Sequence, residues 1–513
     1  MPQLLAGTDW ATLMAQAHAA APQAFGTDGH PLNLLAGEWG HPGRRKATLS
    51  PVDGSAICSY PMLDLETARH AVGYAAGEAP LWAAVALSER CRRVADCLSG
   101  LREHRNLLVN LLVWEIGKTI KSAGADVDRC IDGVDWYLSQ IEGMMDGRRP
   151  VGVVSNIASW NYPLSVLFHS VLVQCLAGNA VVSKTPTSGG LMTLTVCHAV
   201  ARQCGLPVAL VSGSGGQLSD ALVRNDGVDC LAFVGGKSHG RDVAAGLYDR
   251  NKRYMLEMEG VNAYGVWDFS DWAGLSKQIT AGYEYGKQRC TAYVRFVVQR
   301  TLLPRFLEAY LPAVRGMKVG HPLLVNDSNS TAPSLDFGPQ ISSAKVEELN
   351  GLVGEAIGAG AAPIFRGELD PARFFPDQDT SAYVAPVALL GVPRSCQLYH
   401  HEPFGPVDTI VLVDRVEELV AEMNVSNGAL VASLATDNPA TATAIASELR
   451  AFKVGHNRMR SRGDRAEPFG GIGQSWKGCF VGGEHLVRAV TVGPPGERLA
   501  GNFPDQIALP EGR

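Results

Sequence analysis

Cys290 is the residue of this sequence whose chemistry and surroundings single it out first. It follows Gly-Lys-Gln-Arg and precedes Thr-Ala, where an incoming helix is expected to give way to the apolar-rich run 293–298. A thiol at such a junction can face a cleft and be reached by a substrate. The chain holds 11 cysteines, and most intracellular cysteines are simply small buried residues. Cys290 therefore becomes a candidate nucleophile only through the groups that accompany it.

Glu257 is an acidic residue within the otherwise apolar strand predicted over 254–258. Burying a carboxylate is costly unless it is paired or protonated, so its presence there needs a reason. One reason is a structural hydrogen bond. The other is general-base chemistry, for which burial usefully raises the pKa of a carboxyl group. The sequence leaves both open.

Asn161 follows one predicted strand, and Lys184 ends another. The pattern predicts a buried strand over 151–157, a turn at 159–163, a helix to about residue 176, and a second strand over 180–184. A strand-helix-strand unit builds a parallel sheet whose ligand crevice lies at the carboxyl ends of its strands. The alternatives are ordinary turn chemistry for Asn161 and a surface position for Lys184.

The strand-helix pattern repeats further along the chain. Strands are predicted over 206–212 and 228–234, followed by the glycine-containing loops 213–216 and 235–240. Glycines between a strand and a helix let a pyrophosphate approach the free N–H groups of the helix. The loop 235–240 is not GxGxxG, and an ordinary turn is the alternative, but the repeated context favours a dinucleotide.

Length, composition and charge narrow the class of protein. A chain of 513 residues predicts two or three domains, and 46% apolar residues with 56 glycines indicate an α/β protein. A formal charge of −6 without a basic stripe argues against nucleic acid as a partner. His169 and Gln174 interrupt the longest apolar run, so no membrane span is expected. The N-terminus shows no signal-peptide pattern. The cysteines form no CxxC pair and no Cys/His cluster at metal-binding spacing, so we expect a cytoplasmic protein with reduced thiols.

A second α/β segment is predicted after Cys290. Its strands are expected over 294–299, 383–390, 407–413 and 430–435, with helices over 303–311, 343–357 and 416–424. Ahead of the first sheet, helices are expected over 65–76, 88–104 and 105–137. An arginine-rich loop, 457–467, precedes Pro-Phe-Gly-Gly, and the tail beyond Gly493 is expected to be extended.

Several separated motifs, in order, make the sequence resemble the aldehyde dehydrogenase superfamily over roughly residues 34–492. The motifs are Trp160-Asn161-Tyr162-Pro163, Ala177-Gly178-Asn179 with Lys184, Phe233-Val234-Gly235-Gly236, Leu256-Glu257-Met258, Gln288-Arg289-Cys290-Thr291, Glu402-Pro403-Phe404-Gly405-Pro406 and Pro468-Phe469-Gly470-Gly471. The resemblance implies NAD(P)-dependent oxidation of a small-molecule aldehyde to a carboxylic acid, through a cysteine thiohemiacetal and a thioester.

The resemblance also implies residue roles. Cys290 would be the nucleophile, Asn161 and the Cys290 N–H would hold the oxyanion, and Glu257 would activate the hydrolytic water. The implied cofactor residues are Trp160, Lys184, Thr187, Gly213, Gly235, Gly236, Glu402 and Phe404. Of these, Lys184 would hold the adenosine ribose and Glu402 the nicotinamide ribose. No metal is implied.

The implied fold is a Rossmann-like parallel-sheet cofactor domain plus a second α/β catalytic domain, with a reduced oligomerisation element. We expect an N-terminal extension over 1–33, the cofactor domain over 34–256, the catalytic domain over 257–456, and a return to the cofactor domain over 457–513. The family's hairpin arm is shortened here to 142–150, which disfavours an arm-built tetramer and leaves a dimer. His485 to Val492 resembles an oligomerisation strand.

Four positions depart from the family pattern. Thr187 stands where an acidic residue often binds both ribose hydroxyls, so NADP is expected at least as readily as NAD. Gly236 replaces a serine that would bind pyrophosphate. Lys287 replaces a glycine; it either lowers the pKa of Cys290 or points into solvent. Glu259 replaces the first glycine after Glu257.

The substrate and the competing functions are the least determined features. Arg458 and Arg460 in the loop before Pro468 could hold the carboxylate of a semialdehyde; a solvated basic loop is the alternative. A coenzyme-A-acylating relative is a second hypothesis, against which Glu257 argues, because a waiting thioester should be shielded from activated water. The third is a non-catalytic binding protein on the same fold.

Overall fold

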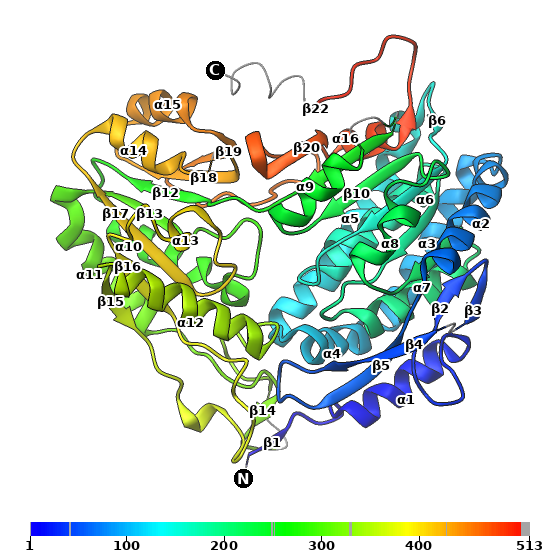
Figure 1. Ribbon diagram of the computed structural model, residues 1–513, viewed down its shortest axis with the longest axis horizontal. Helices are drawn as coiled ribbons and strands as arrows, with labels where there is room; N and C mark the ends of the chain where they lie inside the picture. Colours follow the sequence, from blue (N-terminus) through cyan, green and yellow to red (C-terminus); the bar gives the residue numbers. More distant parts are fainter. Residues whose placement is uncertain are drawn as a thin grey trace.

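The computed structural model describes residues 2–40, 43–247, 250, 252–327, 331–426 and 428–503. These residues form two lobes, each built on one large sheet (Figure 1). The first sheet has nine strands in the order β22-β20-β11-β10-β7-β8-β9-β2-β3. The second has seven, in the order β15-β16-β17-β13-β12-β18-β19. The α/β fold with two sheets agrees with the fold class expected from the sequence.

The centre of the nine-stranded sheet is parallel, as strand-helix alternation predicts. Its parallel strands are β7 (Val153–Ile157), β8 (Ala180–Lys184), β9 (Val208–Val211), β10 (Cys230–Val234) and β11 (Arg253–Glu257). Antiparallel strands complete both edges: β2 (Asn33–Leu35), β3 (Glu38–Gly40), β20 (Trp476–Cys479) and β22 (Gly501–Asn502). The chain thus returns to the first lobe near its C-terminus.

Helices cover both faces of this sheet because its strands are apolar on both sides. On one face lie α2 (Leu65–Ala83) and α8 (Gly215–Leu222). The opposite face is covered by α3 (Leu87–Glu103), α4 (Arg105–Ile116), α5 (Ile120–Met145), the π-helix η2 (Pro163–Phe168), α6 (His169–Leu176) and α7 (Leu191–Gln203). The helix α9 (Lys237–Ala245) follows β10.

The seven-stranded sheet is parallel except for its edge strand β15 (Ala362–Arg366). Its other strands are β12 (Ala263–Val266), β13 (Arg295–Gln299), β16 (Val387–Leu390), β17 (Val407–Val413), β18 (Ala429–Ala435) and β19 (Ala451–His456). The helices of this lobe are α10 (Trp272–Gly282), α11 (Leu303–Arg315), α12 (Ser343–Gly358), α13 (Gln397–His400), α14 (Val416–Met423) and α15 (Pro439–Glu448).

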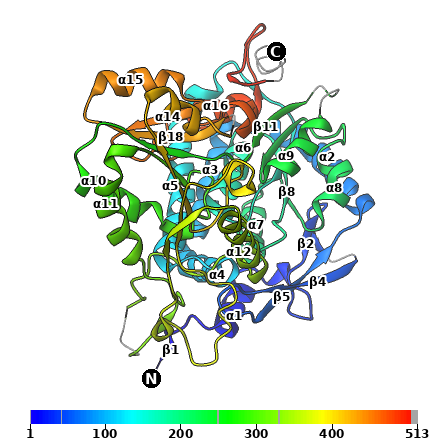
Figure 2. The ribbon, with the colours of Figure 1, turned by 60° about the vertical axis from the view of Figure 1, so that its left-hand side comes forward.

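The N-terminal residues join the two lobes at the base of the molecule. Strand β1 (Gln3–Leu4) pairs with β14 (Leu324–Val325) of the second lobe, while α1 (Trp10–Ala20) lies against the first (Figure 2). The hairpin of β4 (Arg44–Leu49) and β5 (Ala56–Met62) lies beside α1. The Trp114 indole donates to the carbonyl of Thr8 at 2.6 Å.

Three sequence-based expectations about secondary structure are wrong. The loop expected over 235–240 is mostly helical, because α9 begins at Lys237. The helix expected over 105–137 is two helices, because Gly117 takes a left-handed φ of +71° and Thr119 caps α5. The strand expected over His485 to Val492 is largely the helix α16 (Glu484–Ala489). Only β21 (Thr491–Val492) is extended, and it pairs with β6 (Arg149–Pro150) of the same chain.

The segment between α5 and β7 holds no hairpin arm. Its seven residues, 146–152, are all described, and the only strand among them is β6. Arg148 fixes this segment to the C-terminal region through a paired contact with Glu497 at 2.7 Å. The last ten residues of the expected extended tail, 504–513, lie outside the described residues. No helix in the described part of the chain is long and apolar enough to span a membrane.

Candidate active site

The carboxyl edge of the nine-stranded sheet carries the first group of candidate residues. Glu257 is the last residue of β11 and is in register with Val234, while Lys184 ends β8 in register with Ile157. The turn after β7 holds Trp160 and Asn161, and the π-helix η2 follows it. Because these strands are parallel neighbours, their carboxyl ends lie on one edge of the sheet, where ligands bind in such folds.

Cys290 reaches this edge from the second lobe. It lies in the loop between the short 3₁₀ turn η3 (Glu284–Lys287) and β13. The side-chain amide of Asn262 donates to the carbonyls of Cys290 at 2.7 Å and Ala292 at 3.0 Å, which fixes the loop. Asn161 of the first lobe donates to the carbonyl of Gln288 at 3.0 Å. The amide and the thiol loop are therefore joined directly across the two lobes.

One cavity of about 200 Å³ brings most of the predicted residues together. Its lining is Ser159, Trp160, Asn161, Val234, Gly235, Gly236, Glu257, Met258, Glu259, Cys290, Glu402 and Phe404. All three expected catalytic residues and five of the expected cofactor residues are in this set. Lys184, Thr187 and Gly213 are outside it, along the same edge of the sheet.

Cys290 and Glu257 interact within this cavity. Burial and the hydrogen-bonded Glu257 carboxylate raise the pKa of the Cys290 thiol well above its usual range. The positive charge of Arg462 acts in the opposite sense. The sulfur is therefore a thiol at neutral pH, and its proton has an acceptor next to it.

Glu402 is a buried carboxylate with no partner of its own. Both of its side-chain oxygens lack hydrogen bonds, and the residue is 6% exposed. Burial, followed by the nearby charge of Glu259, raises the pKa of Glu402 well above its usual range. An unpaired buried carboxyl group is unfavourable unless a ligand supplies hydrogen-bond donors. Its neighbour Phe404 has a left-handed φ of +50° and places its ring centroid 5.8 Å from that of Trp160.

The glycines of the strand-helix loops differ in the space around them and in their backbone conformation. A Cβ at Gly235 would lie 2.7 Å from the Phe233 ring, so a larger residue does not fit there. A Cβ at Gly236 would meet nothing within 4 Å, so the space of the missing serine is open. Gly213 has a φ of +155°, where glycine is strongly favoured.

Lys184 and Thr187 lie at and just beyond the carboxyl end of β8 and differ in exposure. Burial lowers the pKa of Lys184 to about 8, and its ammonium donates to the carbonyl of Thr185 at 2.9 Å. Thr187 and Ser188 are exposed. The lysine is therefore buried rather than a solvated surface residue.

The expectation that Lys287 points into solvent is wrong. Its side chain is buried, forms an ion pair with Asp408, and donates to the carbonyl of Tyr293 at 2.8 Å. The groups with the largest effects on the pKa of Cys290 are Glu257, Glu402 and Arg462 rather than Lys287.

The arginines of the loop 457–467 differ in their contacts and in their exposure. Arg460 is held by Glu467 at 2.8 Å, and Arg458 is exposed. Arg462 points a different way: its guanidinium carbon lies 5.0 Å from the centroid of the buried Phe469 ring. Its charge lowers the pKa of both Cys290 and His169. Arg462 is thus the arginine of this loop whose charge acts on Cys290.

Sequence reasoning missed Asn262 and did not distinguish Arg462 from its neighbours. Asn262 is a polar residue before the apolar strand β12, and that isolated polarity was the available signal. No local pattern separates Arg462 from Arg458 or Arg460, because their directions depend on Glu467 and Phe469.

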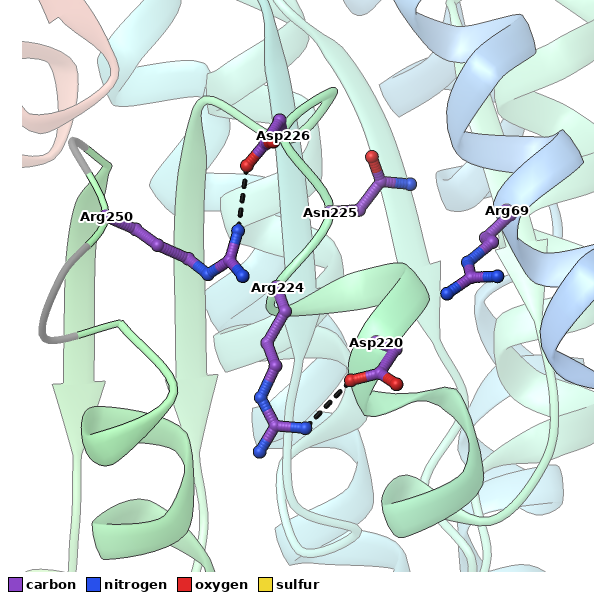
Figure 3. Close-up of a pocket in the computed structure, with 6 residues that line it drawn as sticks. All are labelled: Arg69, Asp220, Arg224, Asn225, Asp226 and Arg250. Atoms are coloured by element: carbon purple, nitrogen blue, oxygen red, sulfur yellow. Dashed lines mark hydrogen bonds and ion pairs between the residues drawn. The ribbon is translucent and has the colours of Figure 1, made fainter.

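A second hollow of about 480 Å³ is lined by five charged residues and Asn225 and is separate from this site (Figure 3). Its arginines already have carboxylate partners: Arg224 pairs with Asp220 and Arg250 with Asp226, both at 2.8 Å. Arg69 pairs with Glu66 at 2.6 Å. The described residues contain no cluster of metal-ligating side chains, and all eleven cysteines are free thiols.

Comparison with known proteins identifies the class. The family described as "Aldehyde dehydrogenase family" matches residues 39–492. The NADP-dependent glyceraldehyde-3-phosphate dehydrogenase of Streptococcus equinus is 26% identical over 90% of this chain and 96% of its own length. The alpha-ketoglutaric semialdehyde dehydrogenase of Bacillus subtilis (strain 168) is 26% identical over 86% of this chain and 93% of its own.

A solved structure agrees with the sequence comparisons. The NADP-dependent glyceraldehyde-3-phosphate dehydrogenase from Bacillus halodurans C-125, complexed with NADP, superimposes with a TM-score of 0.81 at 25% identity. The match covers 90% of this chain and 98% of that one. The chain therefore belongs to the aldehyde dehydrogenase family, whose members oxidise aldehydes with NAD or NADP.

The residues present fit such a cofactor. The unpaired Glu402 oxygens can accept from ribose hydroxyls, and the glycine turn at the start of α9 leaves open space at Gly236. Lys184 supplies a buried ammonium on the same sheet edge. The helix N-terminus of α9 is suited to a pyrophosphate.

Proposed function

We propose that this protein oxidises a semialdehyde to the free dicarboxylic acid, with Cys290 as nucleophile, Asn161 as oxyanion donor and Glu257 as base. The observation that carries the proposal is that these three side chains line one small cavity together with Glu402 and Phe404. These side chains are far apart in the sequence, and the fold does not need them to meet. A shared reaction is the best explanation of why they line the same cavity.

The first half of the reaction forms a carbon–sulfur bond. The Cys290 sulfur attacks the aldehyde carbon as its proton passes to the hydrogen-bonded Glu257, which then releases that proton to solvent. The carbonyl oxygen becomes negative and is stabilised by N–H donors. One N–H of the Asn161 amide is used by the carbonyl of Gln288, and Asn161 lines the cavity, so we assign its second N–H to the oxyanion. Within the described residues, the backbone N–H of Cys290 donates to no protein group and is free for the same oxyanion.

The second half releases the acid. Glu402, Gly236 and Lys184 would hold NAD or NADP, which would supply a hydride acceptor for the former carbonyl carbon. Cys290 would then carry the acyl group as a thioester. Glu257, ionised again, takes a proton from a water molecule whose oxygen attacks the thioester carbon. The carbon–sulfur bond breaks, the carboxylic acid leaves, and Glu257 returns the proton to the sulfur, which restores the thiol. The coenzyme-A alternative is disfavoured because Glu257 lies beside the sulfur.

A panel of aldehydes, each supplied with NAD and with NADP, tests this activity by the absorbance of the reduced cofactor. The product is analysed with and without coenzyme A. Free acid in both cases supports hydrolysis by Glu257. Turnover that requires coenzyme A, or no turnover with any aldehyde, would overturn the proposal.

Arg462 is the residue expected to hold the substrate carboxylate. A charged hydrogen bond of this kind contributes about 1.5–3 kcal/mol, so Arg462→Met is expected to lower kcat/KM for a semialdehyde by roughly ten- to a hundredfold. A neutral aldehyde of equal length should lose much less, since it has no carboxylate to lose and is affected only through the pKa of Cys290. Arg458→Met is the matched control, because that side chain is exposed on the same loop. Equal losses on both aldehydes would refute this assignment.

Thr187 is expected to permit NADP. With no carboxylate at this exposed position, a 2′-phosphate meets no repulsion, and Lys184 lies on the same strand end. Thr187→Glu should lower kcat/KM with NADP by roughly tenfold or more while sparing NAD, since the new charge repels the phosphate. Thr187→Gln controls for side-chain size. A wild-type preference for NAD above about a hundredfold, or about 2.7 kcal/mol, would contradict this expectation.

We also propose that the enzyme is a cytoplasmic homodimer without an arm-built tetramer. The short 146–152 segment and its pairing with β21 within the same chain support this, as do the free cysteines. Light scattering during size-exclusion chromatography would measure the mass; a tetramer would exclude the dimer.

A further inference from the structure

The turn before Cys290 has an unusual backbone. Tyr285, Gly286 and Lys287 have consecutive positive φ angles of 58°, 59° and 59°. Left-handed conformations are comfortable for glycine but strained for other residues, because Cβ crowds the backbone. Such strain persists only where the surrounding structure enforces it, and it concentrates at functional sites. Lys287 therefore needs contacts that hold it in this conformation.

The ammonium of Lys287 closes the loop that carries Cys290. It donates to the carbonyl of Tyr293 at 2.8 Å, so a single side chain links the two ends of the segment 287–293. The same ammonium forms an ion pair with Asp408 and lies 4.1 Å from the centroid of the Tyr283 ring. The exposed fraction of the Lys287 side chain is only 2%. The contact thus constrains the loop from inside the protein.

Asp408 connects this loop to the cofactor side of the cavity. It is the second residue of β17, directly after the segment that contains Glu402 and Phe404. Its carboxylate also accepts from the hydroxyls of Tyr283 and Tyr310, both at 2.7 Å. Tyr283 follows α10, and Tyr310 belongs to α11. The four side chains form a buried cluster under the nucleophile loop.

We propose that Lys287 is a positioning residue that holds Cys290 in register with Asn161 and with the Glu402–Phe404 segment. This role rests on the proposed function, because it assumes that Cys290 is the nucleophile. Burying an ion pair is costly, and apolar packing can often replace such a pair without loss of stability. The loop geometry explains why a lysine stands here: an apolar side chain cannot donate to the Tyr293 carbonyl. Because Asp408 neutralises its charge, Lys287 acts through position rather than through the thiol pKa.

The test compares Lys287→Met with the double variant Lys287→Met/Asp408→Asn. The single variant is expected to bind NADP with unchanged Kd and to lose about a hundredfold in kcat, the loss that a displacement of about 1 Å causes. Its Tm should also fall, because an unpaired buried carboxylate remains. The double variant removes that carboxylate and should regain Tm while kcat stays low. A purely structural role would restore both.

Two further variants keep the experiment decisive. Lys287→Gly relieves the left-handed strain and should show the same loss of kcat if the methionine variant does not fold. Glu422→Gln breaks the buried Arg295–Glu422 pair elsewhere in this lobe and should lower Tm without changing kcat. A folded Lys287→Met or Lys287→Gly enzyme with wild-type kcat would overturn the positioning role alone. Wild-type protein that oxidises no aldehyde would overturn the proposed function, and this role with it.

Discussion

Cys290→Ser is expected to lower kcat/KM for every aldehyde by at least about 10⁴-fold, because a neutral hydroxyl is a far weaker nucleophile than sulfur. The Cys290 loop is held by Asn262 and Lys287 through backbone carbonyls, which the substitution leaves in place. Cofactor binding and Tm should therefore remain at wild-type values. Turnover is measured by reduced-cofactor absorbance, and cofactor Kd by fluorescence titration.

Cys479→Ser provides the matched control for this prediction. Cys479 is a buried cysteine of β20, outside the cavity, and its substitution should leave turnover unchanged. Retained turnover in Cys290→Ser would remove the nucleophile from the proposed mechanism. Loss of turnover together with loss of cofactor binding would instead indicate a damaged cavity, which the unchanged Kd is designed to exclude.

Glu257→Gln is expected to separate the two halves of the reaction. Without a base for water, the thioester persists, so steady-state turnover should fall by roughly 10²- to 10⁴-fold. A burst of about one reduced cofactor per active site should precede this slow phase, as covalent catalysis predicts. Stopped-flow absorbance measures both the amplitude and the slow rate. Because Glu257 also takes the Cys290 proton in the first half, the burst itself should be slower than in wild type, with solvent accepting the proton instead. A slow phase with no burst at all would contradict the assignment of thioester hydrolysis as the step that Glu257 mainly limits.

The same variant has a second readout that is independent of turnover. The Glu257 carboxylate raises the pKa of Cys290, because a nearby negative charge disfavours the thiolate. Removing that charge lowers the thiol pKa and increases the thiolate fraction at neutral pH. Alkylation of Cys290 by iodoacetamide at a fixed neutral pH should therefore be faster in Glu257→Gln than in wild type. Equal rates would contradict the contact between these two groups.

Local sequence patterns predict the strands that build the cavity. Strand β8 spans 180–184 and β17 spans 407–413, as expected, since both are apolar runs bounded by polar or turn residues. Lys184, Glu257 and Asn161 reach one edge because parallel strands share a direction. The family motifs add Cys290 and Glu402 from the other lobe, which periodicity alone does not place.

Features that depend on distant partners are not readable from the sequence. Lys287 and Asp408 are separated by 121 positions, so nothing local indicates that the lysine is buried. The direction of Arg462 likewise depends on its packing over Phe469. The helix break at Gly117, in contrast, has a local signal in the sequence: a glycine followed two residues later by the capping Thr119. The periodic apolar pattern that continues across this break obscures the signal.

The most direct test of the account is the mass of the Glu257→Gln enzyme, quenched with acid shortly after mixing with a semialdehyde and NADP. Intact-protein mass spectrometry should show one added acyl group, and peptide mapping should place it on Cys290. Repeating the experiment with Cys290→Ala/Glu257→Gln should remove the adduct. An acyl group on another residue, or reduced cofactor formed with no adduct at any time, would contradict the proposal that Cys290 carries the aldehyde carbon through oxidation.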